Sequence, residues 1–173
     1  LIEIENYRTI FNRPKQDWRT QKESQKLIIA VKHGNRIHPA TEVLPQHAGP
    51  PLYYTTPVIN CIYDCQYCFL QAMYRSANMV VFVNEEDFYG DAKKTATEQG
   101  KISLSVSYDS DLLASERFIP WTSRWIEFAR LNQDIEVEVR TKSSNYSLIK
   151  HLQPHKQAIL SWSLASPSAW KRY

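Results

Sequence analysis

The chain has 173 residues, 43% hydrophobic and 23% charged, a composition typical of a soluble globular protein with its own core. No apolar run is long enough to span a bilayer, and charged residues interrupt the first dozen positions, so neither a membrane anchor nor a signal peptide is indicated. The chain does not begin with Met and stops soon after a strand-like run, so we expect a fragment of a longer protein.

Basic charge is concentrated near the N-terminus. The whole chain carries a net charge of +3, whereas residues 1–38 contain eight basic and four acidic residues. Tyr7, Phe11 and Trp18 are interleaved with them, a pattern that can hold phosphates and stack on nucleic-acid bases. The competing interpretation, which the pattern alone favours, is a solvated basic face above three core aromatics.

Hydrophobic periodicity predicts strands that alternate with helices. The expected strands are residues 27–31, 79–83, 102–108, 136–139 and 158–164, with a short apolar stretch at 58–60. The expected helices are residues 67–74, 85–98, 121–131 and 146–152. Residues 39–57 are rich in Pro and read as a loop. This order is typical of βαβ units in a parallel α/β sheet, which places ligands at the carboxyl ends of its strands.

Three cysteines lie within eight residues, as Cys61, Cys65 and Cys68 in the spacing C-x3-C-x2-C. The odd number argues against a disulfide framework and predicts free thiolates in a reducing cytoplasm. Three thiolates on one tight loop can each bind one iron of a 4Fe–4S cluster. The amino and carboxylate groups of S-adenosylmethionine can then chelate the fourth iron, and an electron from the cluster yields a 5′-deoxyadenosyl radical.

Other metal sites compete with this interpretation. A structural zinc site needs four ligands, and a set of three cysteines and one histidine would have to recruit His38 or His47. A conventional four-cysteine electron-transfer cluster lacks its fourth cysteine in this sequence. A zinc- or cluster-bearing binding module without activity therefore stays open beside an enzyme.

The cysteine spacing resembles that of the radical S-adenosylmethionine superfamily. Residues 65–71 (CQYCFLQ) and 78–84 (NMVVFVN) more narrowly resemble the spore photoproduct lyase family, and residues 11–14 (FNRP) with 33–36 (HGNR) resemble its proteobacterial branch. The resemblance covers about residues 10–163. It implies a partial (β/α)6 barrel, with residues 1–56 as a basic N-terminal extension and Pro-rich loop and residues 57–173 as the first part of the barrel, roughly four strands.

The resemblance also implies roles for individual residues. Cys61, Cys65 and Cys68 match the cluster ligands. Three polar residues match cofactor contacts that follow the second and third barrel strands or lie on the fourth: Ser110, Lys142 and Ser163. Lys142 matches a lysine that contacts the cofactor carboxylate.

The hydrogen-donor relay departs from the family pattern. The family's donor is a cysteine just after the second barrel strand, and the matching residue here is Tyr108. The tyrosine that follows the last cluster cysteine is Phe69, whereas Tyr67 is kept. Tyr108 either donates hydrogen through its phenol or packs against the substrate, and the sequence leaves both open.

The implied function is that of a radical S-adenosylmethionine enzyme, lyase-like, with DNA lesion repair as the leading activity. Its partners would be DNA and a reducing electron donor of the flavodoxin or ferredoxin type. The alternative within the superfamily is an enzyme acting on a peptide or small molecule. The lost relay residues make repair of the spore thymine dimer the weakest part of the resemblance.

Overall fold

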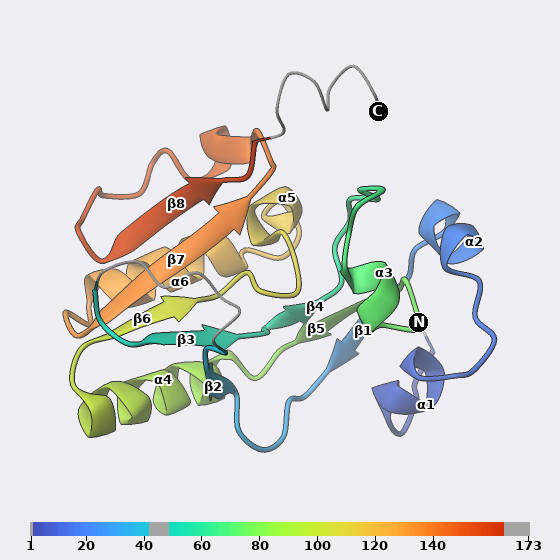
Figure 1. Ribbon diagram of the computed structural model, residues 1–173, viewed down its shortest axis with the longest axis horizontal. Helices are drawn as coiled ribbons and strands as arrows, with labels where there is room; N and C mark the ends of the chain where they lie inside the picture. Colours follow the sequence, from blue (N-terminus) through green and yellow to red (C-terminus); the bar gives the residue numbers. More distant parts are fainter. Residues whose placement is uncertain (1, 42–48, 165–173) are drawn as a thin grey trace.

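Two sheets organise the residues that the computed structural model describes, 2–41 and 49–164 (Figure 1). The smaller sheet has the order β1-β5-β4, from Leu27–Ala30, Met79–Phe82 and Val58–Ile59. The larger sheet has the order β2-β3-β6-β7-β8, from Ile37–Pro39, Leu52–Thr55, Ile102–Ser105, Ile135–Thr141 and Ala158–Trp162. The predicted mixed α/β class is therefore confirmed.

Four neighbouring strands of the larger sheet, β3, β6, β7 and β8, pair in parallel. This run agrees with the four strands expected of a partial barrel, but within the described residues the sheet stays open and no barrel closes. Two pairings differ from the all-parallel expectation, because β2 pairs with β3 and β4 with β5 in antiparallel fashion. The connection from β4 to β5 is the segment that carries the three cysteines.

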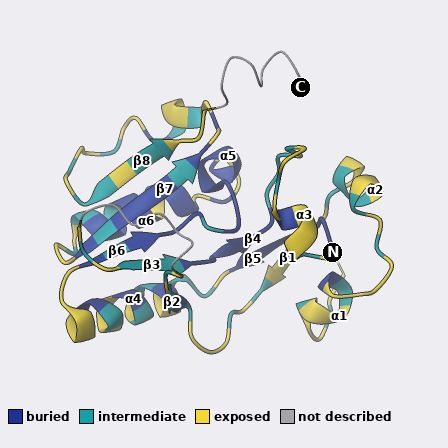
Figure 2. Cartoon of the chain, in the orientation of Figure 1, coloured by how far each residue is buried: buried dark blue, intermediate teal, exposed yellow. Residues whose placement is uncertain are grey.

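Among the described residues, helices cover one face of the larger sheet (Figure 1). They are α4 (Glu85–Gln99), α5 (Leu112–Ser115) and α6 (Trp121–Arg130). On α6, Trp121, Trp125 and Phe128 repeat at helical spacing, and all three are buried. Strand β7 buries Val137 and Val139 completely. Figure 2 shows this interior as a continuous buried band through β6 and β7.

The local predictions fail where tertiary pairing overrides sequence signals. Strand β3 lies inside the stretch that reads as a Pro-rich loop, because Tyr53, Tyr54 and Thr55 suit a strand and pair with the neighbours on both sides. The helix expected at 67–74 is reduced to α3 (Leu70–Met73), and the one expected at 146–152 is a 3-10 turn, η1 (Asn145–Leu148). The remaining predicted helices and strands are confirmed within a few residues at their ends.

In the N-terminal extension, α1 (Tyr7–Phe11) packs onto β1 of the smaller sheet, and α2 (Trp18–Glu23) accepts hydrogen bonds through Gln21 from Ser76 and Ala77. The Tyr7 ring lies edge-on to Phe82 with 5.6 Å between centroids, and Phe11 is buried. These two aromatics therefore belong to the core, as the competing interpretation has it, and are not free to stack on bases. Residues 1–56 supply strands to both sheets, and the domain boundary at residue 56 stays a prediction. Among the described residues, no helix has the length and apolarity needed to cross a membrane.

The cysteine loop leaves β4 through Asn60, a fully buried residue with a left-handed backbone (φ 65°). Asparagine tolerates this conformation better than most residues. Its Nδ2 donates to the carbonyl oxygens of Ser76 at 2.6 Å and Asn78 at 2.8 Å. Asn60 therefore joins the start of the loop to its end, just before β5.

Replacing Asn60 by Ala removes both hydrogen bonds and the amide that favours the left-handed backbone. We expect Asn60→Ala to lower the free energy of unfolding by about 2–4 kcal/mol, as measured by urea denaturation. Asn12→Ala, at an exposed turn, is the matched control and should change it by no more than about 0.5 kcal/mol. A loss below about 1 kcal/mol at Asn60 would contradict this role of its amide.

Candidate functional site

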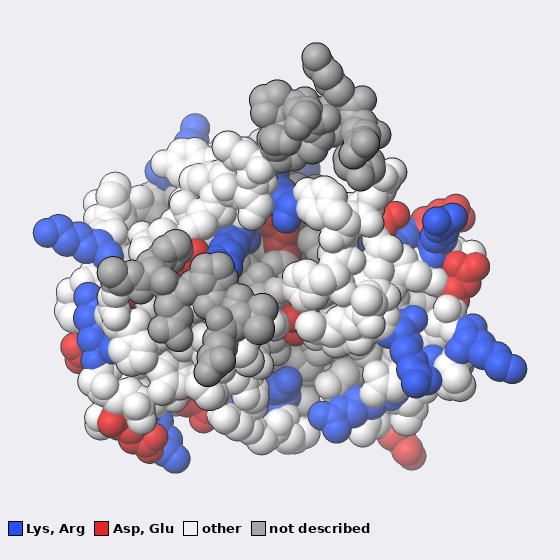
Figure 3. Space-filling model, viewed as in Figure 1, with Lys and Arg blue, Asp and Glu red and all other residues white. Residues whose placement is uncertain are grey.

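A cavity of about 260 Å³ lies between the cysteine loop and the carboxyl ends of the parallel strands. Figure 3 shows the hollow at the centre of this face, with acidic and basic side chains in its wall. All eight residues that the sequence singles out line this cavity: Cys61, Cys65, Cys68, Tyr67, Tyr108, Ser110, Lys142 and Ser163. Their side chains thus come together from the loop and from three strand ends, while their chemical roles remain predictions.

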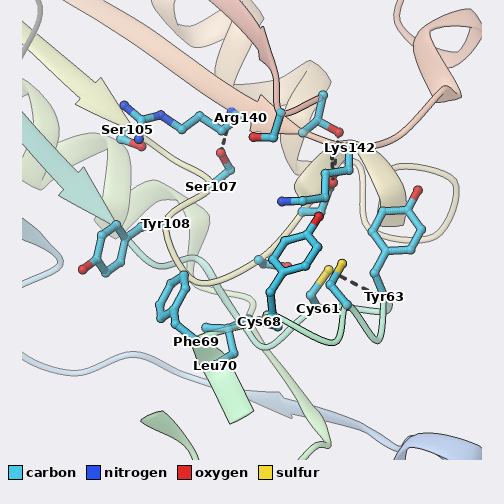
Figure 4. Close-up of a pocket in the computed structure, with 16 residues that line it drawn as sticks. Cys61, Tyr63, Cys68, Phe69, Leu70, Ser105, Ser107, Tyr108, Arg140 and Lys142 are labelled. Atoms are coloured by element: carbon cyan, nitrogen blue, oxygen red, sulfur yellow. Dashed lines mark hydrogen bonds between the residues drawn. The ribbon is translucent and has the colours of Figure 1, made fainter. Parts of the chain in front are cut away.

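The cysteine loop is held by its own backbone. The Cys68 N–H donates to the Cys65 carbonyl at 2.9 Å, and the Gln71 amide donates to the same oxygen at 3.0 Å. The N–H of Tyr63 points to the Cys61 sulfur at 3.4 Å (Figure 4). Burial raises the pKa of the Cys61 thiol, and the N–H groups of Tyr63 and Asp111 oppose that rise. Such N–H donors stabilise a sulfur that carries negative charge.

The donor set of this loop fits a cubane cluster. Three free, partly exposed thiols face one cavity, and polar side chains from three strand ends face them across it. Within residues 2–41 and 49–164, no group of three or more His, Cys, Asp or Glu side chains is placed to hold one metal ion. A cubane does not require such convergence, since each thiolate binds a different iron.

The histidines considered for a zinc site do not complete one in the described structure. His38 lies on β2, where its ring packs 5.3 Å from that of Tyr54, and it does not line the cavity. Burial lowers the pKa of His38. His47 lies outside the described residues.

The opposite wall is tied together by Asp111, a buried carboxylate in the loop after β6. It accepts hydrogen bonds from the Thr141 hydroxyl at 2.6 Å and from the Lys142 N–H at 2.7 Å. It also caps α5 by accepting from the Ala114 N–H at 3.0 Å. One carboxylate therefore sets the distance between the ends of β6 and β7.

The Lys142 side chain extends from this anchored backbone into the cavity (Figure 4). Its Nζ lies 5.9 Å from the centre of the Tyr67 ring, which comes from the cysteine loop. Within the described part of the chain, its ammonium forms no ion pair. Lys142 is therefore a cation available to an anionic group in the cavity.

The two serines differ in their surroundings. The Ser110 hydroxyl is buried at the cavity wall, and no partner for it is found among the described residues. A buried hydroxyl without a partner costs free energy, which a ligand atom can recover. Ser163 is exposed at the end of β8, where its N–H donates to the Thr141 carbonyl at 2.8 Å.

Aromatic rings form the remaining end of the cavity. Tyr108 lies 6.3 Å from Phe69 across the cavity mouth and 4.4 Å from Tyr54 on β3, measured between ring centroids. Burial raises the pKa of Tyr54. Sequence reasoning missed Tyr54, because its strand read as a loop. The run of β-favouring residues from Tyr53 to Thr56 was the available signal.

A second residue missed by sequence reasoning is Asp109, which follows Tyr108 and is buried. It accepts a hydrogen bond from the Tyr74 hydroxyl at 2.5 Å, and this contact links the end of α3 to the loop after β6. Burial raises the pKa of Asp109 and also that of Tyr74. The pair fixes the backbone beside Tyr108.

Sequence reasoning also missed Arg140 as a cavity residue, although it lies two positions before Lys142, near the end of β7. Its Nε donates to Glu138 at 2.9 Å, and its backbone N–H donates to the Ser107 hydroxyl at 2.7 Å (Figure 4). The Ser161 hydroxyl donates to the same carboxylate at 3.0 Å. These contacts join β7 to β8 and to the loop after β6, and Arg140 and Ser107 line the cavity.

Comparison with known proteins finds no matching family model and no matching curated protein. Solved structures do match. Spore photoproduct lyase complexed with dinucleoside spore photoproduct aligns with a TM-score of 0.76 and 14% identity over 99% of this chain and 48% of that chain. A cysteine-to-alanine variant with the same ligand gives a TM-score of 0.74 and 17% identity over 85% of this chain and 42% of that one.

A third structure, a doubly substituted spore photoproduct lyase with bound AdoMet and dinucleoside spore photoproduct, gives a TM-score of 0.71 and 16% identity over 85% of this chain. The alignments cover 42% to 48% of these solved proteins, so this chain spans less than half of their length. At this identity the likeness establishes the fold. The described residues therefore share the fold of about half of a spore photoproduct lyase.

Proposed function

We propose that this chain is the cluster- and cofactor-binding part of a radical S-adenosylmethionine enzyme of the spore photoproduct lyase type. The observation that carries the proposal is the cavity in which the three cysteines face Ser110, Lys142 and Ser163. A 4Fe–4S cluster on Cys61, Cys65 and Cys68 supplies the electron that cleaves S-adenosylmethionine into methionine and a 5′-deoxyadenosyl radical. The likeness in fold to structures of spore photoproduct lyase supports this assignment.

The strand-end residues bind and orient the cofactor in this proposal. The Lys142 ammonium pairs with the cofactor carboxylate, since it extends into the cavity, whereas Arg140 at the cavity wall already pairs with Glu138. The Ser110 hydroxyl gains a hydrogen bond that the described structure does not provide. Ser163 offers a polar contact at the end of β8. Each electron comes from an external reductant of the flavodoxin or ferredoxin type.

DNA carrying a lesion is the substrate class that we favour. Solved spore photoproduct lyases of this fold hold dinucleoside spore photoproduct. The exposed cations Arg13, Lys15 and Arg19 on the N-terminal extension suit a phosphate backbone. Binding to lesion-containing DNA should then weaken steeply as salt increases.

A different substrate of the same chemistry is the second candidate. The aromatic end of the cavity favours this candidate. Tyr108 stands there in place of the family's donor cysteine, and Phe69 stands in place of its relay tyrosine. A peptide or small molecule would bind independently of the basic extension. Salt-insensitive turnover without DNA would support this candidate.

The first test concerns the cluster. After anaerobic reconstitution of the full chain with iron and sulfide, we expect about four irons per chain and formation of 5′-deoxyadenosine from S-adenosylmethionine. Replacing any one of Cys61, Cys65 or Cys68 by Ala should abolish this cleavage, because each thiolate holds one iron. Zinc without acid-labile sulfide would instead identify a metal-binding module, and cleavage by the triple variant would refute the assignment.

The second test concerns Lys142. Removing a charge-assisted hydrogen bond worth about 1.5–3 kcal/mol should weaken S-adenosylmethionine binding about ten- to a hundred-fold in Lys142→Ala. Iron content should not change, because the Lys142 backbone contact with Asp111 is kept. Lys150→Ala, exposed and outside the cavity, is the matched control. Wild-type affinity in Lys142→Ala would make Lys142 a surface residue.

The third test concerns Tyr108, which we assign as the hydrogen donor to the substrate radical. Tyr108→Phe keeps the ring contacts with Tyr54 and Phe69 and loses only the hydroxyl. With lesion-containing DNA, we expect a tyrosyl radical signal during wild-type turnover and its loss, with side products, in the variant. Tyr53→Phe, on the neighbouring strand, should behave as wild type. An unchanged product distribution in Tyr108→Phe would mean that Tyr108 only packs against the substrate.

A further inference from the structure

Three side chains of the N-terminal extension reach the base of the cysteine loop. The Gln25 amide donates to the Cys61 carbonyl at 3.0 Å and to the Ala77 carbonyl at 2.6 Å. The Gln21 carbonyl oxygen, on α2, accepts from the Ala77 N–H at 2.8 Å. Lys22, the next residue of α2, donates from its Nζ to the Cys61 carbonyl. The extension thus holds the loop on both sides.

Lys22 differs from its two neighbours because it brings a charge. It shares its acceptor with Gln25, so the neutral amide already provides a hydrogen bond to the Cys61 carbonyl. If Lys22 served only to hydrogen-bond the Cys61 carbonyl, a neutral side chain such as a second glutamine could do the same. The side chain of Lys22 is instead half-buried against the loop, where a cation is costly unless negative charge lies nearby.

The negative charge near Lys22 comes from the cysteine loop itself. The Nζ of Lys22 donates to the carbonyl oxygen of Cys61, so the cation lies at the base of the loop that carries all three cysteines and Asp64. The salt bridges found among the described residues do not include Lys22. The cation therefore lies against the backbone of a cluster ligand without an acidic partner among the described residues.

We propose that Lys22 is a positioning residue that stabilises the reduced state of the cluster through its charge. The inference rests on the proposed function, because it requires a cluster on Cys61, Cys65 and Cys68. Three thiolates around a 4Fe–4S core give a net charge of −1 when oxidised and −2 when reduced. Reduction adds one electron and no proton in this scheme, and a fixed cation in a poorly solvated position favours the more negative state.

The test is a redox titration of the reconstituted full chain without S-adenosylmethionine, followed by the spectrum of the reduced cluster. Lys22→Gln keeps a hydrogen-bond donor and removes the charge, whereas Lys22→Arg keeps the charge. Lys26→Gln removes the same charge from an exposed position in the same extension. We expect Lys22→Gln to lower the ratio of reduced to oxidised cluster about tenfold at a fixed potential, about 59 mV for one electron.

The arginine variant and Lys26→Gln should both keep the wild-type potential. A wild-type potential in Lys22→Gln would overturn the proposal and leave Lys22 with a packing role. Loss of iron in Lys22→Gln but not in Lys22→Arg would also overturn it, and would make Lys22 an assembly residue. Failure of the wild-type chain to take up iron and sulfide would refute the proposed function itself, an outcome that no Lys22 variant can mimic.

Discussion

The candidate site depends on the closure of the loop that carries the cysteines. Its two ends meet in the interior, where the buried amide of Asn60 holds the carbonyls of Ser76 and Asn78. Because these polar groups are away from water, opening the base of the loop would leave several of them unpaired. The thiols therefore project from a fixed base, and the N-terminal extension reinforces it through the Cys61 carbonyl.

The cavity wall that faces the cysteines is also held by one buried polar side chain, the carboxylate of Asp111. Asp111 binds the hydroxyl of Thr141, the N–H of Lys142 and the start of α5, so the ends of β6 and β7 keep a fixed spacing. Asp111 binds only the backbone N–H of Lys142, so the Lys142 ammonium stays available to a ligand in the cavity. Lys142 thus has a fixed backbone and an unpaired side-chain charge, a combination that suits contact with an anionic group of a ligand.

The aromatic end of the cavity is where chemistry can differ from that of the solved proteins with this fold. Tyr54, Tyr108 and Phe69 form a run of neighbouring rings, and the buried pair Asp109 and Tyr74 fixes the backbone beside it. In the proposed function, a phenol held between two rings would approach a substrate radical with less freedom than a thiol on a short side chain. Under that proposal, differences of substrate or of hydrogen-transfer route arise at this end of the cavity and not at the cysteine loop.

The sequence by itself determined the features that depend on local patterns: the cysteine spacing, most helices and strands, and the polar residues placed after successive parallel strands. The site residues could be listed in advance because the resemblance to the spore photoproduct lyase family implied them, and they come together because the carboxyl ends of parallel strands meet at one edge of a sheet. Tertiary structure alone decided that β3 is a strand, that Phe11 is buried in the core with Tyr7 packed against it, and that Lys22 contacts the Cys61 carbonyl. These outcomes arise from contacts between residues far apart in the chain, whose pairing and burial energies outweigh local propensity and leave no periodic trace in the sequence.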